Sequence, residues 1–142
     1  MRPAHTPLVR EHAEALSLAH RLIRSDAASA PGDRRALLRY WYGSGAAHLR
    51  VEEHVLLAAW ARHGGEHHPL AAAIRAEHAQ LSAGVAAIAR DGHASPERLR
   101  ATGHALAAHI HRQERELFGA VEHVVPPREL AEVGAVLESL RH

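Results

Sequence analysis

Each of four helical stretches in this chain places a histidine on or beside a stripe of apolar residues. The clearest stretch runs from Asp33 to Gly64, where the stripe recurs at steps of three and four, the spacing of one buried helix face. The stripe consists of Leu38, Trp41, Gly45, His48, Glu52, Val55 and Ala59. The pattern therefore predicts that His48 and Glu52, one turn apart, both point into the protein interior.

Two further stretches repeat this arrangement with a single histidine. Between Leu70 and Ala89 the stripe of Ala71, Ile74, His78, Leu81, Val85 and Ile88 carries its histidine near the middle. Near the N-terminus the same spacing links Leu8, His12, Ala15, Ala19 and Leu22. We expect His78 and His12 to face the interior, as His48 does.

The fourth stretch carries its polar residues beside the apolar line, which is formed by Leu106, Ile110, Leu117 and Val121. His109 and Glu114 flank this line. The residue four after His109 is Gln113, so the carboxylate of Glu114 comes five residues after the histidine instead of four. Gln113 thus remains an alternative to Glu114, and Glu53 remains an alternative to Glu52.

Core packing alone accounts poorly for so many polar residues on apolar faces. A lone histidine on such a face is usually a satisfied core residue. Burying carboxylates without partners would cost several kcal/mol each, so a bundle that repeats this pattern calls for a compensating cation. Imidazole and carboxylate together suit iron, manganese or zinc. The candidate metal ligands are His12, His48, Glu52, His78, His109 and Glu114.

These segments resemble the hemerythrin family, in its bacterial HHE cation-binding branch. The resemblance rests on Glu11-His12, on His48 to Leu56, on Glu77-His78 and on His109 to Phe118, in family order. It spans the chain from about Leu8 to Leu140. It implies a centre of two iron ions bridged by carboxylates, with manganese or zinc as other metals that the donors suit. The implied assignment is one iron at His12 and His48, the other at His78 and His109, and bridges at Glu52 and Glu114.

Centres of this kind bind or react with dioxygen, nitric oxide or peroxide, so the resemblance implies a protein that binds or senses a small oxidant. Two alternatives stay open: an enzyme that reduces peroxide or nitric oxide or repairs iron centres, and an iron store or buffer. A sensor would need a partner protein, and an enzyme would need a reductant. Oxygen-carrying hemerythrins have two histidines four apart on the third helix, whereas this chain has Ile74 one turn before His78. One iron should therefore have one ligand fewer.

Glycines, prolines and capping residues divide the chain into helices. We expect four long helices at about residues 7–25, 33–64, 69–91 and 95–126, with Asp33 capping the second, and a short fifth at 127–140. Long helices with short connections fold most economically as an up-down-up-down four-helix bundle. The expected fold class is thus all-α. The 142 residues suit one domain, residues 1–142.

Composition excludes several other functions. Cysteine is absent, which rules out disulfides, thiolate metal sites and thiol catalysis. The net charge is +1 without a basic block, so no nucleic-acid partner is expected. No apolar run approaches the roughly 20 residues that span a bilayer, and no membrane partner is expected. The N-terminus lacks the apolar stretch of a signal peptide, so we expect a cytoplasmic location.

Overall fold

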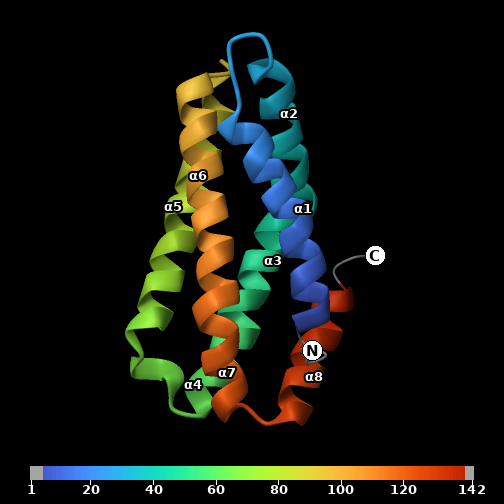
Figure 1. Ribbon diagram of the computed structural model, residues 1–142, viewed down its shortest axis with the longest axis vertical. Helices are drawn as coiled ribbons and strands as arrows, with labels where there is room; N and C mark the ends of the chain where they lie inside the picture. Colours follow the sequence, from blue (N-terminus) through green and yellow to red (C-terminus); the bar gives the residue numbers. More distant parts are fainter. Residues whose placement is uncertain (1–4, 140–142) are drawn as a thin grey trace.

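The chain folds as a bundle of long helices (Figure 1). The computed structural model describes residues 5–139, with side chains for residues 11–51, 53–136 and 138–139. In Figure 1 the chain climbs α1, descends through α2, α3 and α4, climbs α5, and descends through α6 and α7. The helices are α1 (His5–Ile23), α2 (Ala30–Tyr40), α3 (Ala46–Val51), α4 (Leu57–Arg62), α5 (Pro69–Asp91), α6 (Pro96–Arg112), α7 (Phe118–Val124) and α8 (Pro127–Ser139). No strand occurs among the described residues, and the all-α prediction is confirmed.

The bundle has four columns, and two of them, residues 30–62 and residues 96–124, each consist of α-helical pieces joined by π-helical turns. Trp41–Gly45 and Glu52–Leu56 join α2, α3 and α4, and Gln113–Leu117 joins α6 to α7. A π turn adds one residue to the helical repeat, and such turns are frequent at functional sites. The second and third of these turns each begin four residues after a histidine, His48 and His109 respectively. The helix phase therefore changes beside both histidines.

Most helix ends lie close to where the breakers predict them. Gly64 and Gly92 follow α4 and α5 closely, with φ angles of +99° and +71° that favour glycine. Ser95 caps α6, because its hydroxyl accepts a hydrogen bond from the backbone N–H of Arg98 at 3.3 Å.

The start of the second column differs from the prediction that Asp33 caps it. α2 begins at Ala30, so Asp33 lies in its first turn, where its buried carboxylate accepts hydrogen bonds from Arg21 Nε at 2.7 Å and Ser29 Oγ at 2.8 Å. Burial opposes ionisation, but the hydrogen bonds from Arg21 and Ser29 hold the pKa of Asp33 below its ordinary value. The carboxylate thus ties α1 to α2 and is not available to cap the helix.

A glycine allows α1 and α6 to pack closely. A Cβ atom on Gly103 would lie 2.8 Å from the carbonyl oxygen of Ala19 and 2.8 Å from the Cβ of Leu22. Real Cβ atoms do not approach other atoms so closely, so only glycine fits at this position.

The buried apolar side chains form two clusters, one in each half of the bundle. One cluster includes Ala19, Leu37, Leu81, Val85, Leu99 and Leu106, and the other includes Leu57, Trp60, Ile74, Leu117, Val121 and Leu130. Along α5, His78 falls between Ile74 of one cluster and Leu81 of the other. Buried polar side chains of all four columns lie at the same junction: Glu11, His12, His48, His78, His109 and Gln113. The fold therefore places a polar layer between two apolar halves.

The predicted fifth helix is present as α8 and lies beside the lower part of α1 in Figure 1. Leu130 and Val133 join the cluster that contains Trp60, so α8 closes that end of the core. The side chain of Leu137 and the whole of Leu140, which the sequence also places on the apolar face, lie outside the described residues. None of the described helices has both the length and the apolar composition needed to cross a membrane.

Candidate metal centre

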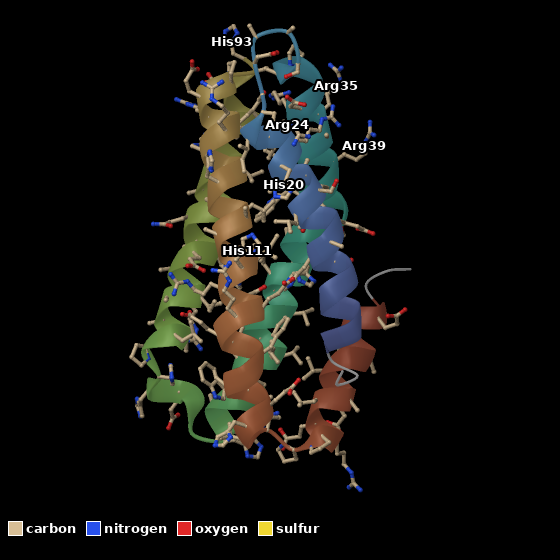
Figure 2. All side chains as sticks on the ribbon, viewed as in Figure 1. His20, Arg24, Arg35, Arg39, His93 and His111 are labelled. Carbon is tan, nitrogen blue, oxygen red and sulfur yellow. The ribbon has the colours of Figure 1, made fainter. Side chains whose placement is uncertain are left out.

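Four histidines from four different helices form the centre of the polar layer. His12 comes from α1, His48 from α3, His78 from α5 and His109 from α6. Each is at most 5% exposed. These are the four histidines that the sequence places on or beside an apolar stripe. Other histidines lie elsewhere: His20 and His93, for example, project from the outer surface (Figure 2).

His78 and His109 face each other directly. Their Nε2 atoms are 3.2 Å apart, and their ring centroids are 4.7 Å apart. The opposite nitrogen of each ring meets a carboxylate, because Glu53 lies 2.9 Å from His78 Nδ1 and Glu77 lies 2.8 Å from His109 Nδ1. The ionised carboxylates only accept hydrogen bonds, so each Nδ1 must carry the proton and donate it.

This arrangement directs two imidazole lone pairs toward each other. A neutral imidazole whose Nδ1 carries the proton has only an acceptor at Nε2. Two acceptors 3.2 Å apart require a proton or a cation between them. Two imidazole nitrogens bound at about 2.0–2.1 Å to one metal lie roughly 2.9–3.4 Å apart for bond angles between square and tetrahedral. The spacing of His78 and His109 therefore fits a pair of ligands on one cation.

The other half of the layer contains His12 and His48. Their ring centroids are 5.7 Å apart and the ring planes are nearly perpendicular, at 78°. His12 Nδ1 lies 3.4 Å from Glu114 Oε1, and the His12 ring stacks on Phe118 with centroids 5.6 Å apart. The structure thus brings together the two members of each histidine pair that the resemblance assigns to one iron. The side chain of Glu52, the predicted bridge, lies outside the described side chains.

The two halves of the layer follow one pattern. In each half a Glu-His pair lies on one helix: Glu11-His12 on α1 and Glu77-His78 on α5. In each half, polar residues also occur four and five positions after the second histidine. They are Glu52 and Glu53 after His48, and Gln113 and Glu114 after His109. Glu53, five residues after the histidine of one half, contacts His78 of the other half at 2.9 Å. In the same way Glu114 contacts His12 at 3.4 Å. The site therefore has approximate two-fold symmetry.

This symmetry breaks at the position four after the histidine. One half has Glu52 there, and the other has Gln113. Gln113 is 1% exposed, whereas the side chain of Glu114 is 42% exposed and faces the Nδ1 of His12. The structure therefore places Gln113 in the buried layer and Glu114 at its edge, in the position that Glu53 occupies beside His78.

Sequence reasoning missed the contribution of Glu77. Its two carboxylate oxygens contact His109 Nδ1 at 2.8 Å and Arg112 Nε at 2.7 Å. The hydrogen bond that Arg112 donates to the Glu77 carboxylate holds the pKa of Arg112 above its ordinary value. Arg112 also bonds Glu116 at 3.2 Å. The signal was present in the sequence, because an acid directly precedes the inward histidine on both α1 and α5.

The third helix offers no second histidine at the site. Ile74, one turn before His78, is fully buried in the apolar cluster. Among the described side chains, which exclude that of Glu52, no three histidine, aspartate or glutamate residues gather as a ready-made metal site. The six-residue ligand set accordingly remains a prediction, and the structure contributes the two pairs and their carboxylate partners.

The fold and the buried polar layer are typical of one class of protein, the helical bundles that bind cations between their helices. Comparison with known families shows which family of this class the chain belongs to. The model of the hemerythrin HHE cation-binding domain matches residues 5–121, and the chain belongs to this family. No curated protein and no solved structure gives a significant match to the chain. The match covers all four histidines of the layer.

Proposed function

We propose that this chain is a non-haem di-iron protein that binds or senses a small oxidant: dioxygen, nitric oxide or peroxide. The proposed ligands are His12, His48, Glu52, His78, His109 and Glu114. The observation that supports the proposal best is the pair of Nε2 atoms 3.2 Å apart, each on a ring whose Nδ1 meets a carboxylate. Carboxylates behind ligating histidines are the usual support of metal sites.

The residues around the site have separable roles in this proposal. Glu53 and Glu77 fix the orientation of His78 and His109 and keep the proton on Nδ1, which leaves Nε2 as the donor atom toward a cation. The apolar clusters on either side limit the access of water. Iron held here would supply one-electron chemistry and open positions for a small oxidant. Manganese and zinc suit the same donors, and iron is the member of this set that the proposed function requires.

A second candidate function, reduction of peroxide or nitric oxide, is favoured by one observation. The buried position of Ile74 provides no imidazole where the oxygen-carrying relatives have one. A site with fewer protein ligands keeps a position for a reactant, as catalytic metal sites do compared with structural ones. We therefore expect the reduced protein to oxidise rapidly in air.

Metal analysis tests the di-iron proposal. The protein loaded with iron under anaerobic conditions should hold two irons per chain. Replacing His78 with alanine should remove at least one iron and lower the melting temperature of the loaded protein, because metal binding and folding are coupled. His104, an exposed histidine of α6, gives the matched control, and His104→Ala should retain both irons. Full iron content and an unchanged melting temperature in His78→Ala would contradict the proposal.

Substitution of Ile74 tests the choice between binding and reduction. Ile74→His would place a further imidazole one turn before His78, and it should slow the oxidation of the reduced protein in air. Ile74→Leu is the control for a change of shape without a new ligand. If the unmodified protein shows absorption bands that appear in air and vanish under vacuum over many cycles, the chain is a carrier and the reductase candidate fails.

A further inference from the structure

A surface cavity of about 450 Å³ lies against the candidate metal centre. One side comes from the second column, with Trp41 and Leu49, and the other from α5. His78 and Glu53, the hydrogen-bonded pair of the site, also line it. His78 is only 3% exposed, whereas the Glu53 side chain is 31% exposed, so Glu53 is the more solvent-accessible member of the pair that lines this cavity.

Two arginines, Arg50 and Arg75, give this cavity an excess of positive charge. Both are exposed, and neither makes an ion pair or hydrogen bond within the described part of the chain. Among the described lining side chains, Glu53 is the one carboxylate, and it is already hydrogen-bonded to His78 at 2.9 Å. Among the described lining residues, two guanidinium groups therefore face one carboxylate, an excess of one basic side chain. A single negative charge would balance the cavity.

The remaining lining residues indicate what carries that charge. Trp41 and Leu49 form an apolar wall, and Ser82 adds a hydroxyl group. A volume of about 450 Å³ is far larger than an inorganic anion needs and lies within the range of small-molecule sites. Guanidinium groups bind carboxylates through paired, charge-assisted hydrogen bonds. The lining therefore suits a ligand with a carboxylate head and an apolar body.

We propose that this cavity binds a small organic monoanion, a short-chain carboxylate, with its head at Arg50 and Arg75 and its body against Trp41 and Leu49. The bound carboxylate would cover the solvent side of the His78–Glu53 pair. It would thereby control access to that side of the metal centre. This last consequence rests on the proposed function, whereas binding itself does not.

The test uses the metal-free protein, prepared with a chelator, and hexanoate as the probe. The chain has two tryptophans, so an amide nitrogen-15 correlation spectrum contains two indole signals, which Trp60→Phe assigns. Hexanoate should shift the Trp41 signal to saturation and leave the Trp60 signal in place. Hexanol has the same apolar body without the charge, and it should bind at least about tenfold more weakly, since a charge-assisted hydrogen bond contributes that much.

Variants locate the binding site. The double variant Arg50→Gln, Arg75→Gln should weaken hexanoate binding by at least about tenfold for the same reason. Both side chains are exposed, so the fold should be retained, and the thermal transition checks this. Arg39, which projects outward from α2 in Figure 2 and does not line the cavity, provides the control Arg39→Gln. That control should bind hexanoate as the unmodified chain does.

Three results would overturn the inference: equal binding of hexanol and hexanoate, undiminished binding by the double variant, or an equal shift of both indole signals. None of these would bear on iron binding, because the titration contains no metal. Loss of the di-iron proposal through His78→Ala would likewise leave the hexanoate result intact. The two proposals can therefore fail separately.

Discussion

Replacing Glu77 tests whether the carboxylates behind the histidines set metal affinity. In Glu77→Gln an amide oxygen can still accept the Nδ1 hydrogen of His109, so the 2.8 Å hydrogen bond is retained while the negative charge is lost. Removing a supporting group typically costs a factor of 10–100 in metal affinity. We expect about tenfold for Glu77→Gln, or about 1.4 kcal/mol. Glu77→Ala loses the hydrogen bond as well, and about 100-fold is expected, or about 2.7 kcal/mol.

The measurement is a competition for Fe(II) or Mn(II) between the protein and a chromophoric chelator, without oxygen. Glu116→Gln is the matched control, because Glu116 bonds the same Arg112 at 3.2 Å but contacts no histidine of the described layer. Equal affinity in Glu77→Gln and the unmodified chain would refute the supporting role of Glu77. An equal loss in Glu116→Gln would show that the charge of Arg112, and not the imidazole of His109, transmits the effect.

Three other experiments probe the fold and the ligand set. Gly103→Ala should lower the free energy of unfolding by about 1–3 kcal/mol in chemical denaturation, since its Cβ would clash with α1. The control Gly119→Ala, which has open space at the Cβ, should be neutral or stabilising by up to about 1 kcal/mol. Equal effects of the two substitutions would contradict close packing at Gly103. Asp33→Asn should lower the free energy of unfolding by about 1.5–3 kcal/mol at pH 7. Because folding lowers the pKa of Asp33, this difference in stability should shrink as the pH falls below about 4. A difference that does not depend on pH would exclude ionisation of Asp33 as its cause. Glu114→Gln should reduce bound metal far more than Gln113→Ala, because the amide introduced at position 114 lacks the negative charge of the carboxylate. The reverse order of effects in metal analysis would make Gln113 the ligand.

The supporting carboxylates also show how far helix spacing can be followed in the sequence. An α-helical count turns Glu53 off the apolar stripe, toward solvent or a supporting position. In the structure a π turn begins at Glu52, and Glu53 reaches the Nδ1 of His78 on another helix. Neither the extra residue in the turn nor the identity of the facing helix is encoded in local spacing. The supporting role could be suspected from the sequence, but its partner could not.

By itself, the sequence determined which side chains face the interior. Steps of three and four among the apolar residues are a local property of each helix. They place His12, His48 and His78 on a buried stripe and His109 beside one, and all four are buried in the structure. Glycines and capping residues likewise set most helix ends, because turn geometry depends on the residues at the turn. The all-α fold follows from these two local signals.

Only the tertiary structure decided which inward groups meet. His78 lies 31 residues from His109 and 25 from Glu53, and these contacts depend on how the columns pack. Packing also engaged Asp33 with Arg21, so that a carboxylate suited to capping a helix instead joins two helices. Distances between side chains on different helices arise from the shared core, which no single helix specifies. The pairing of donor atoms, and with it the case for a metal centre, therefore came from the packed bundle.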